Sequence, residues 1–269
     1  MVKVVGFITV PIVAGSDQKY TDRGNSTISS NHISFIEPLE WTAIPYQSSH
    51  EELDRFLDTI HLFYIPSGNI GAHESAKYLD NVFYCVRKIK ELNRSGIYFP
   101  IWSVCMGIQL LLAVENRIYH HGDFLNRYDS RGFRTTLPQV NNGRITNSFT
   151  HDEKLMLETT VDKLHNHDFG ISPKMFESTN IKHNYVIIHM NVDRKGNQFI
   201  GTVEHNKYPF YGFQWHPEAS PNCQMFSRFF VSEINKTPNK PMPKELNKGK
   251  LYDCKLYSFN TYEHCYFFK

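Results

Sequence analysis

Three residue types suited to nucleophilic catalysis occur in two short segments of this chain. Cys105 ends the apolar, strand-like run Phe99–Cys105, and the helix-like run Met106–Leu112 begins directly after it. Far downstream, His216 and Glu218 stand two residues apart, separated by Pro217. A thiol nucleophile, an imidazole base and a carboxylate that orients the base are the components of a cysteine-hydrolase triad.

The place of Cys105 between a strand and a helix favours a reactive thiol. Such a thiol faces out of the sheet beside free backbone N–H groups, and the positive end of the following helix favours the thiolate. A buried cysteine is more commonly a small hydrophobe, and Ser103 or Ser148 is an equal candidate on composition alone. The pattern Ser103-x-Cys105-x-Gly107 singles out the cysteine, because tight elbows need small neighbours where two backbones approach.

The local backbone around His216 predicts how it meets Glu218. Pro217 disfavours the helical region for His216, which is therefore predicted to be extended. Residues two apart in an extended segment point the same way, so the Glu218 carboxylate can orient the imidazole and stabilise its cationic form. A lone histidine beside an aromatic run is otherwise more commonly structural.

These motifs match a known family. Val104–Gly107 together with Gln214–Glu218 resembles the class I glutamine amidotransferase superfamily. Within it, the chain is most similar to the γ-glutamyl hydrolases, cysteine peptidases that trim poly-γ-glutamate from folates. The similarity runs nearly end to end, and the tail Tyr257–Phe268 discriminates best because ordinary glutaminase domains lack it. Other similar segments are Val4–Pro11, Phe63–Gly68, Tyr98–Trp102 and Lys207–Glu218.

Roles for the matching positions follow from this resemblance. It implies that Cys105 attacks the γ-amide carbonyl and forms a γ-glutamyl thioester that water resolves. It implies that His216 is first the general base and then the acid for the leaving amine, and that Glu218 orients it. The backbone N–H groups of Gly68 and Met106 would form the oxyanion hole. No metal ion and no cofactor is implied.

Substrate recognition is where the chain departs from the family pattern. His167 matches a family histidine near the substrate glutamate, although His165 competes for that place. Gln109 gives the glutaminase pattern Cys-x-Gly-x-Gln, where γ-glutamyl hydrolases usually carry Glu. The chain reads Ser67-Gly68 where the family has Gly-Gly, and Ser26-Thr27 where the family has a tyrosine close to the substrate. His167 and Gln109 are the substrate-binding candidates.

Alternating elements must hold these residues in place. Strand–helix alternation at the observed spacing predicts an α/β fold with a mostly parallel central sheet, flanked by helices on both faces. The resemblance implies the same amidotransferase-like, flavodoxin-like architecture. Residues 117–150 are predicted to form loops and short strands around the site, and Ser49-x-x-Glu52 reads as a capping box. Strands are predicted at 2–10, 41–45, 60–65, 98–104, 185–191, 198–204 and 209–215, and helices at 27–38, 49–58, 74–94, 106–116 and 221–235.

The chain is expected to divide into three parts. Residues 1–236 form the catalytic domain, and the polar, Pro- and Lys-rich residues 237–250 form a connector. The tail 251–269 is rich in Tyr and Phe, so it is predicted to pack back on the domain as an added strand.

Composition limits the partners and the compartment. With 269 residues, 41% of them hydrophobic, and a net charge of +2, the chain suits a soluble enzyme rather than a nucleic-acid or membrane partner. A small γ-glutamyl compound is the expected partner, and the resemblance suggests a homodimer. No signal segment is visible, so a cytoplasmic location is expected if Met1 is the natural start. Animal and plant family members are instead lysosomal, vacuolar or secreted.

The cysteines are expected to stay largely unpaired. Five cysteines, an odd number without paired spacing, argue against a disulfide framework and for at least one free thiol. No Cys or His spacing resembles a zinc site.

Two rival functions stay open beside the predicted γ-glutamyl hydrolase. Gln109 favours a glutaminase that supplies ammonia to a synthetase partner, whereas the aromatic tail and the absence of a fused synthetase domain oppose it. A non-catalytic binding protein of the same fold is the second alternative, and the complete set of Cys105, His216 and Glu218 opposes it.

Overall fold

A seven-stranded sheet lies at the centre of the computed structural model, which describes residues 2–12, 22–68, 76–117, 124–254 and 263–269. Neighbours from β13 through β6, β5 and β1 to β4 run parallel, and β12 and β11 continue the sheet antiparallel. The predicted mostly parallel α/β sheet is therefore confirmed. Its order is β11 (Tyr185–Val192), β12 (Gln198–His205), β13 (Phe210–Phe213), β6 (Ile101–Val104), β5 (Leu62–Ile65), β1 (Val4–Ile8) and β4 (Glu40–Ile44).

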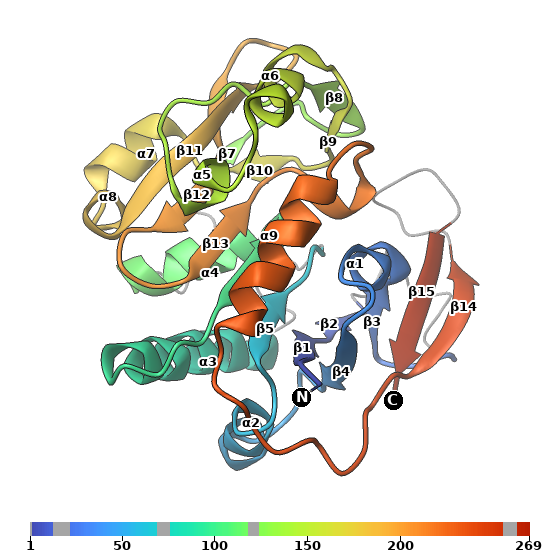
Figure 1. Cartoon of the computed structure of the whole chain (residues 1–269). Coiled ribbons are helices and arrows are strands. Elements are labelled where there is room, and N and C mark those ends of the chain that lie inside the picture. Colours follow the sequence, from blue (N-terminus) through green and yellow to red (C-terminus); the bar gives the residue numbers. More distant parts are fainter. Residues whose placement is uncertain (1, 13–21, 69–75, 118–123, 255–262) are drawn as a thin grey trace.

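Helices cover both faces of this sheet (Figure 1), because alternate strand residues point to opposite sides. In β5, Phe63 and Ile65 belong to one apolar cluster, whereas Leu62 and Tyr64 belong to the other. The first cluster takes in α2 (His50–Leu57), α3 (Ala76–Arg94) and α4 (Met106–Asn116). The second takes in α1 (Ser30–Phe35) and α9 (Gln224–Asn235).

Local sequence signals set several helix ends as predicted. The capping box of α2 is present, with Ser49 accepting from the Glu52 N–H while the Glu52 carboxylate accepts from the Ser49 N–H at 2.7 Å. The helix predicted at 74–94 is observed from Ala76, and residues 74 and 75 lie outside the described residues.

The start of the helix predicted at 27–38 is wrong. Ser26–Ser29 forms strand β3, and α1 begins only at Ser30. The reason is long-range pairing: β3 lies between β2 (Val10–Pro11) and β15 (Glu263–Phe268), which come from the two ends of the chain. A partner at the far end of the chain gives no local pattern.

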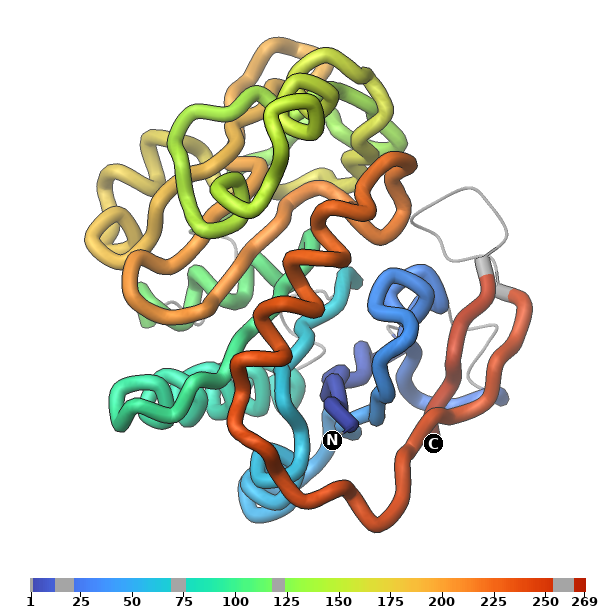
Figure 2. The backbone as a smooth tube through the Cα atoms, viewed as in Figure 1, coloured from blue at the N-terminus to red at the C-terminus, as the bar shows by residue number. Residues whose placement is uncertain are grey.

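The aromatic tail builds a second, four-stranded sheet of order β14-β15-β3-β2, with β14 at Lys250–Cys254. It therefore adds strands beside the central sheet rather than to it. Figure 2 shows the connector passing from α9 beneath the molecule to β14. Lys240 Nζ donates to the Leu57 carbonyl at 2.6 Å, and the Ala43 N–H donates to the Asn247 carbonyl at 2.7 Å. These contacts fix the connector, and the division into three parts stays a prediction.

Short elements from 124 to 184 gather around β11 and β12 (Figure 1). Short strands were predicted within 117–150, but the helix α5 was not, and residues 118–123 lie outside the described residues. The elements are β7 (Asn126–Arg127), β8 (Phe133–Thr135), α5 (Arg144–Asn147), α6 (His151–Thr159), β9 (Lys163–His165), β10 (Phe169–Gly170), α7 (Pro173–Ser178) and α8 (Ile181–Asn184).

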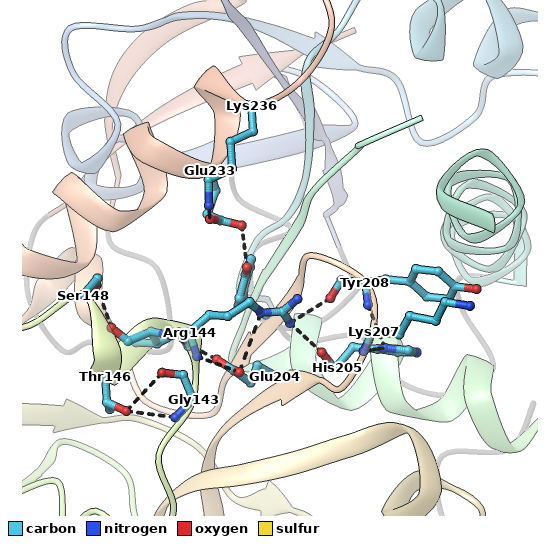
Figure 3. Close-up of polar contacts among 12 residues, drawn as sticks. Gly143, Arg144, Thr146, Ser148, Glu204, His205, Lys207, Tyr208, Glu233 and Lys236 are labelled. Carbon is cyan, nitrogen blue, oxygen red and sulfur yellow. Dashed lines mark hydrogen bonds and ion pairs between the residues drawn. The ribbon is translucent and has the colours of Figure 1, made fainter. Parts of the chain in front are cut away.

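Arg144 ties this region to the sheet (Figure 3). Its guanidinium donates to the carbonyls of His205 and Tyr208 and lies 5.3 Å from the centre of the Tyr211 ring. The buried Glu204 carboxylate accepts from the Arg144 N–H at 2.8 Å. Tyr211 donates in turn to Glu233 of α9. This cluster contacts the start of β13, whereas Cys105 lies beside the end of that strand. We therefore assign the cluster a structural role.

Acid is expected to destabilise this fold because six buried histidines resist protonation. Burial is the main cause that lowers the pKa of each, to about 4 for His32 and to about 3 for His167. Below about pH 6.5 the unfolded chain takes up protons that the native chain refuses, so stability falls from there toward about pH 4. Each histidine contributes up to about 1.4 kcal/mol per pH unit. The six are His32, His61, His165, His167, His189 and His205.

Urea unfolding at matched ionic strength measures this effect. The unfolding midpoint should drop clearly between about pH 7.5 and about pH 5. A midpoint that stays constant or rises over this interval contradicts the prediction.

Candidate active site

Cys105 occupies a strained corner between β6 and α4. Its φ of 54° and ψ of −108° lie in a region that costs a non-glycine residue about 1–3 kcal/mol. The Cys105 N–H donates to the Phe213 carbonyl at 2.6 Å, which ties the corner to β13. Backbone strain of this kind marks functional positions, and the predicted elbow is found where the small-residue pattern put it.

Gly107 permits the close approach that the elbow needs. A Cβ at this position would lie 2.3 Å from the Ile65 carbonyl oxygen, which is a backbone atom that cannot move aside. The first turn of α4 therefore rests directly on β5.

Gly107→Ala is expected to lower both stability and turnover. Overpacking at such a contact costs about 1–3 kcal/mol, and relief of the clash moves the Cys105 elbow. Urea unfolding and turnover of a γ-glutamyl substrate measure the two effects. Gly132→Ala is the control, because its positive φ of 58° strains the backbone while nothing lies within 4 Å of the added Cβ. Turnover that survives Gly107→Ala as well as it survives Gly132→Ala would contradict this account.

The rival serines are engaged elsewhere. Ser103 is buried, and its hydroxyl donates to the Tyr211 carbonyl at 2.9 Å. Ser148 donates to the Ile145 carbonyl at 2.6 Å at the end of α5. Neither serine has the elbow position of a nucleophile.

His216 and Glu218 meet as predicted, but through a different backbone. His216 Nδ1 lies 2.7 Å from Glu218 Oε1, and both side chains are buried. Pro217–Ala219 forms a 3₁₀ turn rather than an extended segment, with His216 at φ −108° and ψ 87° as its N-cap. Proline's fixed φ suits the first position of a helical turn, and this turn folds the carboxylate back onto the imidazole.

The electrostatics favour a protonated imidazole. Burial lowers the pKa of His216, but the charge of Glu218, the charge of Cys105 and hydrogen bonds to both outweigh it and raise the pKa to about 10. Burial raises the pKa of Glu218, yet the charge of His216 and its hydrogen bond outweigh that and hold it below its ordinary value. An imidazolium between a carboxylate and a thiol is the arrangement that keeps a cysteine in its nucleophilic thiolate form.

The other thiols lack this setting. Cys85 and Cys223 are buried and free, and burial raises the pKa of both, that of Cys223 to about 12. The prediction of at least one free thiol is confirmed by these two and Cys105. Cys265 is disulfide-bonded, which the odd cysteine count did not predict.

Gly68 lies against the end of the Met106 side chain. A Cβ on Gly68 would come within 2.9 Å of Met106 Cε and within 2.7 Å of Val10 Cγ1. Gly68 therefore rests on the side chain of the residue that follows the nucleophile. Their N–H groups as oxyanion donors stay a prediction.

His167 lies near the triad, but its surroundings do not distinguish it from His165 as the substrate-binding histidine. Burial and then the charge of His216 lower the pKa of His167 to about 3, and burial is also the main cause that lowers the pKa of His165, so both rings are neutral. The His167 ring stands edge-on to Phe199 with centroids 4.8 Å apart. Among the described residues, neither ring nitrogen of His165 has a hydrogen-bond partner. The competition between these two histidines for the substrate stays open.

Gln109 supports the wall of the site. Its amide Nε2 donates to the Phe169 carbonyl at 2.8 Å and to Gln214 Oε1 at 3.2 Å. Gln214 Nε2 lies 3.9 Å from Cys105 Sγ. The amide nitrogen of Gln109 is therefore used inside the protein, and its role as a substrate-binding residue stays a prediction.

Sequence reasoning missed His32. This buried histidine of α1 places Nδ1 3.6 Å from Glu218 Oε1, next to the acidic end of the triad. It belongs to no catalytic motif and lies in a segment predicted only as helix, so no signal in the sequence pointed to it.

In the described part of the chain, no group of three or more His, Cys, Asp or Glu side chains is placed to hold a metal ion. No helix among the same residues combines the length and apolar character needed to cross a membrane.

Comparison with known proteins gives consistent matches. The family model described as "Glutamine amidotransferase class-I" matches residues 37–232, more than half of the chain. γ-Glutamyl hydrolase B of Dictyostelium discoideum is 24% identical to this chain, over a match that covers 96% of this chain and 78% of that relative. γ-Glutamyl hydrolase 2 of Arabidopsis thaliana is 28% identical to this chain, over a match that covers 94% of this chain and 78% of that relative.

A solved structure shares the fold. A Thermoplasma acidophilum protein described as a putative GMP synthase component superposes with a TM-score of 0.55 at 12% identity. The match covers 87% of this chain and 95% of that one. At this identity the likeness concerns the fold alone.

Proposed function

Because this chain belongs to the class-I glutamine amidotransferase family, we propose that it is a cysteine hydrolase that cleaves γ-glutamyl bonds, with folate poly-γ-glutamates as its substrate class. The observation that carries the proposal is the buried series of Cys105, His216 and Glu218, in which two partners raise the pKa of the imidazole to about 10. The relatives that are named γ-glutamyl hydrolases and match 94–96% of this chain support the choice of bond.

The reaction follows from the placement of these groups. The Cys105 thiolate attacks the γ-carbonyl carbon, and the N–H groups of Gly68 and Met106 donate to the oxyanion that develops. The C–N bond breaks as His216 passes its proton to the leaving amine, which leaves a γ-glutamyl thioester on Cys105. Water then attacks the thioester while His216 takes its proton, the C–S bond breaks to return the Cys105 thiolate, and the product leaves with a free γ-carboxylate. Glu218 holds the imidazole in place throughout.

Glutaminase activity is the competing function. Its one positive signal is Gln109, whose amide nitrogen is engaged with Phe169 and Gln214. These internal hydrogen bonds account for Gln109 without a role in binding glutamine. The residue is therefore a weaker argument for glutaminase activity. A binding protein without catalysis is opposed by the raised pKa of His216 beside a strained nucleophile elbow.

One assay separates the candidates. The purified protein is incubated with a pteroyl-poly-γ-glutamate and, separately, with glutamine, and mass spectrometry follows glutamate units while ammonia is measured. Stepwise shortening of the polyglutamate with little ammonia supports the hydrolase. Ammonia from glutamine with an untouched polyglutamate would establish the glutaminase instead, and no turnover of either would leave a binding protein.

The disulfide indicates the compartment in which the protein resides. We infer an oxidising compartment, because Cys265 is disulfide-bonded. Disulfides persist in secreted, vacuolar or lysosomal proteins and are rare in the cytosol. Fractionation of the native cells tests this, and recovery in the reducing cytosol would contradict it. The homodimer is proposed on the family resemblance, and sedimentation of the purified protein measures it.

A further inference from the structure

His32 lies between Ser67, next to the proposed oxyanion donor Gly68, and Glu218 of the triad. The helix that carries it contains no catalytic motif. His32 lies in α1, which packs against the 3₁₀ turn that bears Glu218. Only 1% of His32 is exposed, so its ring nitrogens must find partners inside the protein.

The contacts of the ring fix its tautomer. The Ser67 N–H donates to His32 Nε2 at 3.3 Å, and Ser67 Oγ lies 2.8 Å from the same nitrogen. A backbone N–H can only donate, so Nε2 carries the lone pair and also accepts from the Ser67 hydroxyl. The ring is neutral because burial lowers its pKa to about 4, and its proton therefore sits on Nδ1. Nδ1 lies 3.0 Å from Tyr64 Oη and 3.6 Å from Glu218 Oε1.

Two of these partners adjoin groups that the proposed reaction needs. Ser67 directly precedes Gly68, whose N–H is the proposed oxyanion donor and which rests against Met106. Glu218 holds His216. The hydrogen bonds go to Ser67 and Tyr64, whereas Glu218 is beyond hydrogen-bond distance. The loop is thus held directly and the triad is not.

We propose that His32 is a positioning residue that fixes the Ser67–Gly68 loop, and with it the oxyanion donor, relative to the Cys105 elbow. The serine at position 67 provides a hydroxyl for this histidine that a glycine would lack. The inference rests on the proposed function, since an oxyanion hole matters only if an acyl group is transferred. It adds a role for α1, outside the triad, in the geometry of that hole.

Two substitutions separate the ends of the ring. His32→Gln places an amide where Nε2 lies and can still accept from Ser67, whereas His32→Asn places its amide where Nδ1 lies and loses Ser67. His32→Asn is expected to lower kcat on the order of 10- to 100-fold with little change in KM, because a displaced donor weakens transition-state binding. His32→Gln is expected to restore kcat to within about 5-fold of wild type.

His61→Gln is the matched control. His61 is also buried and neutral, and its Nδ1 accepts a backbone N–H, from Val4 at 3.2 Å, at the opposite end of the strands. Glutamine places its amide where Nε2 lies and loses this bond, so the variant should lose stability and keep its kcat. Alkylation of Cys105 by iodoacetamide should proceed within about 2-fold of the wild-type rate in His32→Asn, because the thiolate and His216 are left in place.

The outcomes decide between the roles. A low kcat in His32→Asn, rescue in His32→Gln and unchanged alkylation support the proposal. Equal losses of kcat in His32→Asn and His61→Gln would overturn it in favour of general instability, and alkylation that falls with kcat would overturn it in favour of action through the triad. Turnover is assayed on both a γ-linked diglutamate and glutamine. If wild type turns over neither, the proposed function fails and this inference fails with it, whereas full activity in His32→Asn defeats this inference alone.

Discussion

Replacing Cys105 with alanine is expected to lower turnover of a γ-glutamyl substrate by roughly 10⁴-fold or more. Without the thiol no thioester can form, and the remaining donors can only orient the substrate. The fold should survive, because alanine is smaller and the strained φ of 54° is held by the Cys105 N–H bond to Phe213, which the substitution keeps. Turnover measured by mass spectrometry and a urea unfolding curve test both parts.

Cys85→Ala and Cys223→Ala are the controls for this prediction. Both thiols are buried and free, and burial raises the pKa of each, so neither should contribute to turnover. Stability losses in these variants with full activity would show that removal of a buried thiol alone does not stop catalysis. Residual activity near wild type in Cys105→Ala would refute the nucleophile assignment.

The nucleophile elbow could be predicted because its causes are local. A strand-like run, a small-residue pattern around Cys105 and a helical run occupy consecutive residues. The steric reason appears only in three dimensions, where Gly107 meets the Ile65 carbonyl of the neighbouring strand. The parallel sheet was likewise predictable from the order and spacing of elements, which limit the possible topologies to a few.

What failed depends on contacts between distant segments. Ser26–Ser29 becomes a strand because β15 pairs with it, and no local signal in either segment announces the other. The turn at Pro217–Ala219 replaced the expected extended backbone, because proline suits the first position of a helical turn as well as an extended segment. His32 escaped notice for the same reason, since its role arises from Ser67, Tyr64 and Glu218 brought together by folding.

Glu218→Gln is expected to reduce turnover by roughly 10³- to 10⁴-fold. Glutamine has nearly the shape of glutamate but carries no charge, so the contribution that Glu218 makes to the raised pKa of His216 is lost. Its amide also allows the tautomer in which Nδ1 accepts rather than donates. Both changes deprive Cys105 of the imidazolium partner that supports a nucleophilic thiolate.

The pH dependence gives this prediction a sign. In wild type, His216 keeps its proton until the pH approaches about 10, so turnover that needs this proton for the leaving amine should be lost only as the pH rises through that region. In Glu218→Gln the pKa of His216 falls, and this loss of turnover should move to lower pH. Turnover of a γ-glutamyl substrate, followed from about pH 6 to about pH 10, measures the shift.

Glu204→Gln is the matched control for Glu218→Gln. The Glu204 carboxylate is also buried and accepts from a backbone N–H, that of Arg144 at 2.8 Å, but it lies in the cluster that meets β13 at its start (Figure 3). Its loss should lower stability and leave the pH profile of turnover in place. An unchanged profile in Glu218→Gln would mean that Glu218 holds the imidazole only by geometry. A profile displaced equally in both variants would mean that neither carboxylate acts on His216 through its charge.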